Sequence, residues 1–157
     1  MERKRNVLFL CMHNSSRSQM AEAFLRKHAG DQFNVYSVGL EPTEIHPMTR
    51  QVMEDVGLDL QGQSAKGVET YLGKLLVNYL IVVCETANSK CPYTWPGVHE
   101  RLFWPFEDPD AAQGSQEERL AKFRQVRDQI EQRIKSWLEE VGERAESDIH
   151  REAAGRR

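Results

Sequence analysis

Four short segments of the chain have the hydrophobic pattern of β-strands. Residues 6–10 and 79–83 are short apolar runs, a pattern typical of buried strands in a parallel sheet. Residues 33–38 alternate between the two faces of a strand and are rich in residues that favour β-structure. Residues 101–104 predict a short last strand.

Helical patterns separate these segments. In front of the first helical pattern, Ser15 and Ser16 offer N-cap side chains, and Gly30 is a stop signal behind it. In the last pattern the apolar side chains share one helix face, which is formed by Phe123, Val126, Ile130, Ile134 and Leu138. The sequence predicts helices over residues 18–29, 47–56, 70–76 and 116–141.

The alternation of strands with helices implies an α/β fold with a parallel sheet that is covered on both faces. No internal repeat, low-complexity tract or long linker interrupts the pattern. We expect a single domain over residues 1–141. Residues 142–157 are polar and charged, and we expect them to form a frayed tail.

Composition narrows the class of protein. The chain has 157 residues, of which 39% are hydrophobic and 29% charged, as in an ordinary soluble globular protein. A net charge of −3 gives no reason to expect a nucleic acid or an anionic membrane as a partner. The basic cluster at residues 3–5 precedes an apolar run that is too short for a signal-peptide core or a membrane span. We therefore expect a cytoplasmic protein.

Three cysteines, Cys11, Cys84 and Cys91, are the candidate reactive groups. An odd number in a small cytoplasmic protein argues against a structural disulfide framework, and buried or incidental thiols are the simplest alternative. Cys11 and Cys84, however, each follow a predicted strand. The carboxyl ends of parallel strands lie at the same edge of the molecule, where sites in open sheets form. We therefore expect both thiols at that edge. Chance placement remains the alternative.

The segment that joins the first strand to the first helix has the features of an anion-binding loop. Its backbone N–H groups and the helix N-terminus can surround an anion, and Arg17 offers a fork of donors for two oxygens of a tetrahedral oxyanion. The same field is expected to lower the pKa of Cys11 to give a nucleophilic thiolate, to which Ser18 can donate a hydrogen bond. The alternative is a buried cysteine next to a surface arginine. This oxyanion loop consists of Cys11, Met12, His13, Asn14, Ser15, Ser16, Arg17 and Ser18.

The stretch V-L-F-L-C-M-H-N-S-S-R-S-Q-M-A-E resembles the active-site signature of the low-molecular-weight protein tyrosine phosphatase superfamily, which includes the thioredoxin-coupled arsenate reductases. The resemblance extends from about Val7 to Leu138. It implies a doubly wound, flavodoxin-like sheet of four parallel strands with helices on both faces. The chain departs from many members at His13, where they have glycine, and at Ser16, where they have a second cysteine. Ser16 leaves Cys84 as the obvious partner of Cys11.

The segment C-E-T-A-N-S-K-C-P is similar to the redox segment of those reductases, whereas simple phosphatases do not need its two thiols. In a continuous helix the Cα atoms of Cys84 and Cys91 would be ~10 Å apart along the axis. A disulfide requires roughly 4.4–6.8 Å, so the segment has to unwind to form one. Asn88, Ser89 and Pro92 favour such mobility. Inert thiols and a metal site are the alternatives, although no His pair accompanies the cysteines.

The stretch W-P-F-E-D-P resembles the general-acid loop of the superfamily, in which the acid precedes a proline. That resemblance assigns the role to Asp108, with Glu107 as the neighbouring candidate. The alternative is a solvated acidic turn. Tyrosine phosphatases of this family usually have aromatic residues after the proline, but here Asp110, Ala111 and Ala112 follow. A pocket without that aromatic wall suits a small inorganic anion better than phosphotyrosine.

The resemblance implies a relay of thiols that reduces arsenate to arsenite. Cys11 attacks the arsenate, Asp108 protonates the leaving oxygen, Cys84 attacks Cys11, and Cys91 then attacks Cys84. Thioredoxin or a similar thiol reductant would recycle the final disulfide, and phosphate or sulfate would occupy the same loop. Two alternatives remain open: a phosphatase that uses the same Cys11, Arg17 and Asp108, and a redox sensor or binding protein without turnover.

Some relatives bind potassium beside the oxyanion loop. Asn14, Glu22 and Ser37 match part of such a site, but Lys66 stands about where an acid would be expected. Its ammonium group can take the place of the ion. We therefore predict no metal and no cofactor.

Overall fold

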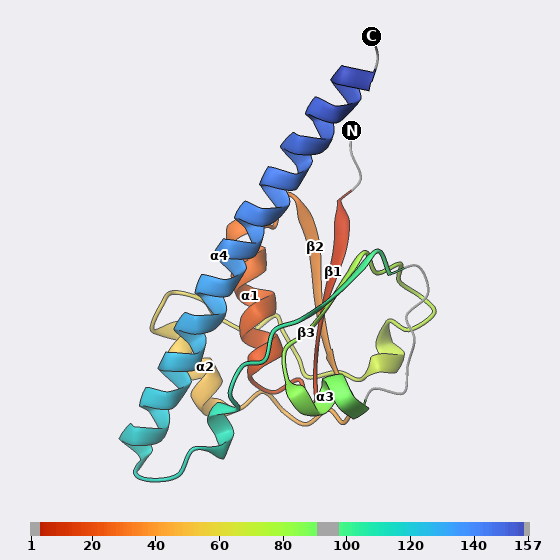
Figure 1. Ribbon diagram of the computed structural model, residues 1–157. Coiled ribbons are helices and arrows are strands. Elements are labelled where there is room, and N and C mark those ends of the chain that lie inside the picture. Colours follow the sequence, from red (N-terminus) through yellow and green to blue (C-terminus); the bar gives the residue numbers. More distant parts are fainter. Residues whose placement is uncertain (1–3, 91–97, 156–157) are drawn as a thin grey trace.

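A sheet of four parallel strands forms the centre of the computed structural model, which describes residues 4–90 and 98–155 (Figure 1). The strands lie in the order β2-β1-β3-β4, and each neighbouring pair is parallel. β1 and β3 occupy the centre because their apolar side chains need cover on both faces. The four strands are β1 (Arg5–Cys11), β2 (Phe33–Gly39), β3 (Tyr79–Val82) and β4 (Glu100–Phe103). The predicted strands and parallel sheet are confirmed.

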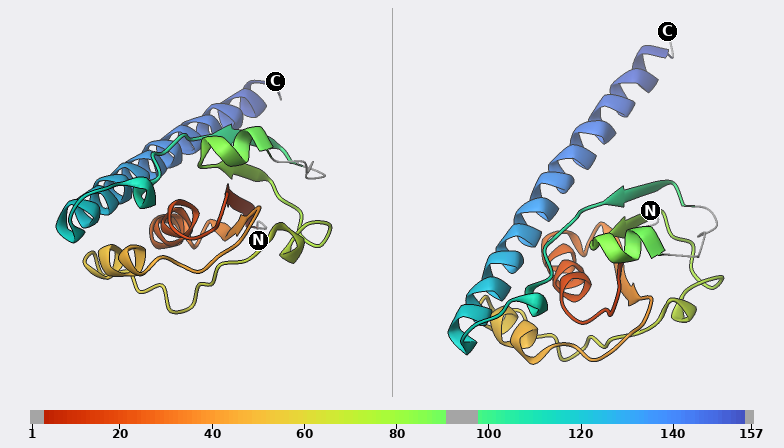
Figure 2. Two further views of the ribbon diagram at one scale, coloured as in Figure 1. Left: turned by 90° about the horizontal axis from the view of Figure 1, so that it is seen from below. Right: turned by 60° about the horizontal axis from the view of Figure 1, so that its bottom comes forward.

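One face of the sheet is covered by α1 (Arg17–Ala29) and α4 (Gln116–Gly155), which pack on each other, while α2 (Pro47–Glu54) lies against α4 (Figures 1 and 2). The ring of Trp137 from α4 lies 5.4 Å from Phe33 and 5.2 Å from Tyr79, measured between ring centroids. These aromatic contacts add to apolar burial between the helix and the sheet.

The opposite face is covered by a segment with little regular structure. It contains the short 3-10 helix η1 (Val68–Thr70), and then Tyr71 packs edge-on against Tyr36 of β2 at 5.0 Å. The helix predicted over residues 70–76 is wrong. Gly73 has a φ of 78°, a left-handed conformation that a right-handed helix cannot contain, so the chain turns there instead.

After β3 the chain forms a helix that the sequence did not predict, α3 (Glu85–Lys90). The cysteine segment is thus helical from residue 85 to residue 90, and unwinding would have to open this helix. Cys91 and Pro92, which the sequence assigns to the same redox segment, lie outside the described residues. A second 3-10 helix, η2 (Pro109–Ala111), follows β4 and leads into α4.

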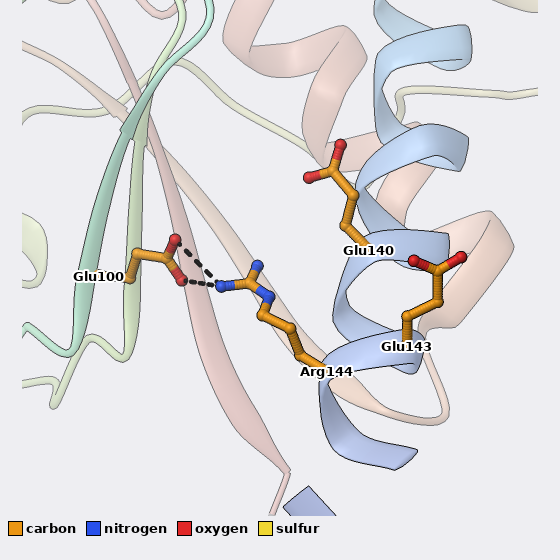
Figure 3. Close-up of a pocket in the computed structure, with 4 residues that line it drawn as sticks. All are labelled: Glu100, Glu140, Glu143 and Arg144. Atoms are coloured by element: carbon orange, nitrogen blue, oxygen red, sulfur yellow. Dashed lines mark hydrogen bonds and ion pairs between the residues drawn. The ribbon is translucent and has the colours of Figure 1, made fainter. Parts of the chain in front are cut away.

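The last helix continues through Gly142 to Gly155, where the sequence predicted a frayed tail. Beyond the core, Arg144 links α4 to the first residue of β4, with its Nη1 atom 3.3 and 3.2 Å from the two carboxylate oxygens of Glu100. Glu140 and Glu143 complete the lining of an open pocket of about 500 Å³ around this ion pair (Figure 3). A single domain over residues 1–141 stays a prediction. Within the described ranges, no helix combines the length and apolar character that crossing a bilayer requires.

Candidate active site

Both candidate thiols lie where the winding of the sheet reverses. From β1 the chain moves outward to β2, and it then returns to form β3 and β4 on the other side of β1. In such sheets the crevice beyond the carboxyl ends of the two central strands is the usual ligand site. Cys11 is the last residue of β1, and Cys84 follows the end of the adjacent strand β3 by two residues. The two thiols, which are 3% and 1% exposed, are brought together as the sequence predicted.

The oxyanion loop is held from outside by the segment that follows β2. The carbonyls of residues 11, 12, 13 and 15 accept hydrogen bonds from the N–H groups of Leu40, Glu41, Thr43 and His46, at 2.8–3.1 Å. Because these carbonyls face outward, the N–H groups of the loop are left to face inward. Within the described part of the chain, the N–H groups of residues 13–16 have no hydrogen-bond acceptor. Such unpaired donors at a helix N-terminus are what a tetrahedral anion requires.

Asn14 fixes the curvature of this loop. Its φ of 52° lies in the left-handed region, which asparagine tolerates better than most residues, whereas His13 keeps an ordinary φ. The Asn14 side chain is fully buried, and its Nδ2 donates to Ser18 Oγ at 2.8 Å and to Ser37 Oγ at 3.0 Å. Its Oδ1 accepts from Gln19 Nε2 and from the Lys66 N–H, both at 2.9 Å. Every polar atom of this amide is therefore paired, which holds the loop in one shape.

The serines of the loop have other roles than the sequence suggested. Ser16 is the N-cap residue of α1, but its side chain makes no capping hydrogen bond. Its Oγ accepts from Thr49 Oγ1 of α2 at 2.8 Å instead, and it lies 3.5 Å from Ser15 Oγ. The hydrogen bond predicted from Ser18 to Cys11 is not found among the described residues. Gln19, Thr49 and the ring of His46 are supporting residues that the sequence analysis missed.

The loop that carries the candidate acid, residues 104–112, lies beside Arg17. We call it the acid loop. Arg17 Nη1 donates to the Phe106 carbonyl at 2.9 Å, and Nη2 is 3.7 Å from Asp108 Oδ2. Glu107 turns away and pairs with Lys122 Nζ on α4 at 3.1 Å. The structure thus brings Asp108, rather than Glu107, to the oxyanion loop.

The two thiols titrate as a pair. The pKa of Cys84 is lowered to about 6, mainly by a hydrogen bond with Cys11 and then by the Ala87 N–H and the Arg17 charge, while burial opposes the shift. The same hydrogen bond, followed by burial, raises the pKa of Cys11 against the effect of Arg17. The lowered pKa that the sequence predicted for Cys11 therefore falls on Cys84, because the hydrogen bond with Cys11 favours the Cys84 thiolate.

The Lys66 ammonium group lies beside Glu22, one of the residues that match part of the potassium site of some relatives. Lys66 Nζ is 3.8 Å from Glu22 Oε1, which also accepts from Ser37 Oγ at 2.6 Å. Burial lowers the pKa of Lys66, and the neighbouring Glu22 opposes this effect. Among the described residues, no group of three or more His, Cys, Asp or Glu side chains could hold a metal ion. The prediction that no metal is needed stays a prediction.

These features have a match among known families: an oxyanion loop after β1, two thiols at the ends of adjacent strands, and an acid beside the arginine. Residues 6–147 match the family model for low molecular weight phosphotyrosine protein phosphatase. The chain belongs to this family. The predicted doubly wound fold with four parallel strands is therefore confirmed. Within the phosphatase family, the most similar proteins point to one branch.

That branch consists of arsenate reductases. A curated arsenate reductase of Bacillus licheniformis is 41% identical over 138 residues, which are 87% of this chain and 96% of the relative. Among solved structures, an arsenate reductase in the phosphate binding state has a TM-score of 0.72 at 31% identity and covers 87% of this chain and 98% of its own. The thioredoxin-dependent arsenate reductase of Corynebacterium glutamicum has a TM-score of 0.66 at 25% identity, over 88% of this chain and 62% of its own.

Proposed function

We propose that this protein is an arsenate reductase that converts arsenate to arsenite by a relay of three cysteines. The observation that carries the proposal is the pair of buried thiols at the switch point, Cys11 in the oxyanion loop and Cys84 two residues beyond the end of the adjacent strand β3. Hydrolysis of a phosphate ester in this fold needs one thiol. Reduction needs a second thiol that can attack the first, and Cys84 is our candidate for that role.

The first step forms a bond between sulfur and arsenic. Cys11 passes its proton to Cys84, and the Cys11 thiolate attacks arsenate held by the loop N–H groups and Arg17. Asp108 protonates the oxygen that leaves as water. Arsenic remains in its +5 state at this point, as an adduct on Cys11.

The second step transfers two electrons to arsenic. Cys84 passes the proton that it received to an oxygen of the adduct and, as a thiolate, attacks the sulfur of Cys11. A disulfide forms, and the pair of electrons from the broken sulfur–arsenic bond goes to arsenic, which leaves as arsenite. Cys91 then attacks Cys84 and releases Cys11 as a thiolate, which leaves a Cys84–Cys91 disulfide. A thioredoxin-type reductant restores the thiols by thiol–disulfide exchange. The similarity to a thioredoxin-dependent enzyme of Corynebacterium glutamicum supports this choice of reductant.

The substrate of the proposed reaction is a small inorganic anion. After Pro109 the acid loop continues with Asp110, Ala111 and Ala112, so no aromatic side chain from these positions can pack against a phenyl ring. A similar arsenate reductase has been solved in the phosphate binding state, which supports the expectation that phosphate and arsenate bind to the same loop. Because the relay requires reduced thiols, a cytoplasmic location suits it.

Replacing the later thiols one at a time tests the relay. Cys84→Ser should block arsenite release, because no thiol remains to attack the Cys11 adduct. Cys91→Ser should allow about one turnover and then stop at a Cys11–Cys84 disulfide, since the acceptor of the next exchange is missing. The measurement is single-turnover arsenite release with purified full-length protein, followed by mass spectrometry of the trapped disulfide.

Two controls separate the reductase from a phosphatase of the same fold. Cys11→Ser should abolish both arsenate reduction and any hydrolysis of a small aryl phosphate, because both reactions begin with the same attack. Such hydrolysis, where wild type shows it, should survive Cys84→Ser and Cys91→Ser. If both variants reduce arsenate through many cycles at the wild-type rate, the relay is wrong and the phosphatase takes its place.

A further inference from the structure

The ring of His46 connects two parts of the site that are far apart in the sequence. Its Nδ1 accepts a hydrogen bond from the Met48 N–H at 3.0 Å, as the N-cap of α2. The Nε2 atom therefore carries the proton of the neutral ring. It lies 3.0 Å from Asp110 Oδ1, and the ring stacks on Phe123 of α4 with centroids 4.8 Å apart. The imidazole is thus fixed on both nitrogens and on one face.

The partner of His46 belongs to the acid loop. The Asp110 N–H donates to Asp108 Oδ1 at 3.0 Å, so these two residues form one turn at the start of η2. Asp110 Oδ1 also receives Arg119 Nη2 from α4 at 3.2 Å. Movement of Asp110 would therefore move the carboxylate of Asp108 with it.

The backbone of His46 belongs to the support of the oxyanion loop. Its N–H donates to the Ser15 carbonyl at 3.0 Å, as one of the hydrogen bonds that turn the loop carbonyls outward. A single residue therefore holds the anion loop with its backbone and the acid loop with its side chain. Asp108 needs such external support, because its side chain is 45% exposed and its contact with Arg17 is 3.7 Å long.

We propose that His46 is a positioning residue for catalysis, which holds Asp108 at a fixed place above the oxyanion loop by its hydrogen bond to Asp110. The inference rests on the proposed function, because it assumes that Asp108 is the general acid. The geometry assigns His46 no contact with the reacting atoms. Its effect on the reaction passes through Asp110 and the turn that carries Asp108.

Two substitutions of His46 separate this role from a structural one. His46→Asn keeps an acceptor for the Met48 N–H but cannot reach Asp110. His46→Gln keeps a donor near the position of Nε2 but loses the cap. Both lose the stack on Phe123, so that loss cancels in the comparison. We expect His46→Asn to lower the single-turnover rate of arsenate reduction about tenfold, a part of what a general acid contributes. His46→Gln should have a lower unfolding midpoint but stay within about twofold of the wild-type rate.

A double-mutant cycle with Asp108→Asn decides whether the effect passes through the acid. Asp108→Asn alone should slow reduction by about a hundredfold, and adding His46→Asn should then change the rate by less than about twofold. Affinity for sulfate, measured by calorimetry, should stay unchanged in His46→Asn, because Arg17 and the loop N–H groups are intact. Asp55→Ala, which removes an ion pair with Arg124 between α2 and α4, is the control for a structural contact and should leave the rate unchanged.

Each other outcome overturns a defined statement. If His46→Asn slows wild type and Asp108→Asn by the same factor, or weakens sulfate binding in proportion to the rate, His46 is structural and the inference fails. If His46→Asn reduces arsenate at the wild-type rate while Asp108→Asn is slow, the inference fails and the proposed function stands. If Asp108→Asn is as fast as wild type, the proposed acid role fails first, and the inference fails with it.

Discussion

Cys84 takes the place of a capping side chain at the start of α3. Its sulfur accepts a hydrogen bond from the Ala87 N–H at 3.4 Å, and its negative charge is favoured at the N-terminus of a helix. Forming a disulfide removes that charge and weakens this cap. The proposed chemistry of Cys84 is therefore coupled to the stability of α3.

The thiol pair predicts a titration that substitution can test. In Cys91→Ser, where only two thiols remain, thiolate absorbance at 240 nm should increase around pH 6, because Cys11 stabilises the Cys84 thiolate. Cys11→Ala in the same background removes the hydrogen bond that contributes most to this shift. The Cys84 titration should then move to higher pH, and an unchanged midpoint would contradict the pairing.

Protein stability provides a second reading of the same pair. The folded pKa of Cys84, about 6, lies below the unfolded thiol value of roughly 8.5, so the unfolded chain binds the extra proton between these values. The free energy of unfolding should therefore increase with pH across this window. As the pH falls through about 6, this contribution of Cys84 is lost. At higher pH the raised pKa of Cys11 acts in the opposite direction. Urea unfolding at several pH values, with Cys11→Ala for comparison, measures both effects.

At the scale of elements, β2 supports the oxyanion loop by direct backbone contact. Its last residue, Gly39, has no side chain, and an added Cβ would lie 2.7 Å from the Asn14 nitrogen and 2.8 Å from the His13 carbonyl carbon. Both distances are shorter than real contacts of a Cβ atom. The strand can therefore lie this close to the loop only with glycine at position 39.

Gly39→Ala should push the loop away from β2. We expect a loss of roughly 1–3 kcal/mol in the free energy of unfolding, as for other overpacked sites. Sulfate should also bind more weakly, because the loop N–H groups no longer converge. Urea unfolding and calorimetry give the two values. Gly62→Ala is the matched control, since nothing lies within 4 Å of its added Cβ; an equal loss in both variants would mean that contact with the loop is not the cause.

The strands could be predicted because their apolar runs are local signals, and the same is true of Cys11 and Arg17 in the loop that follows β1. The helices were harder to bound. Gly73 ends a helical pattern by its left-handed backbone, whereas Gly142, the residue after the predicted end of the last helix, lies inside α4. A glycine within a helix costs about 1 kcal/mol, so only the tertiary context decides between these outcomes.

Much of the support of the site could not be predicted, because its contacts join distant parts of the chain. Asn14 accepts a hydrogen bond from the N–H of Lys66, 52 residues later in the chain. His46 pairs with Asp110, which follows the last strand. Nothing in the local pattern around His46 indicates that partner. The proline at position 47 does indicate a helix start, and could have marked His46 as an N-cap residue.

At the scale of the whole molecule, the two ends of the parallel strands differ in character. The carboxyl ends of β1 and β3 carry the thiols and the oxyanion loop, and the acid loop passes these ends on its way to α4. The amino end of β4 carries the ion pair of Glu100 with Arg144 (Figure 3). Substitutions at that ion pair can therefore alter how α4 is attached without reaching the thiols.

The length of α4 has a consequence for how the protein moves in solution. Its 40 residues extend over about 60 Å, whereas a compact chain of 157 residues is only about 40 Å across. The helix accordingly reaches well beyond the sheet (Figure 1). A body with such a projection has more hydrodynamic drag than a sphere of equal mass, so a single chain should elute from a sizing column ahead of the position for 18.2 kDa. Light scattering on the same peak measures mass independently of shape; a ratio of elution volume to mass that fits a sphere would show that the helix does not project.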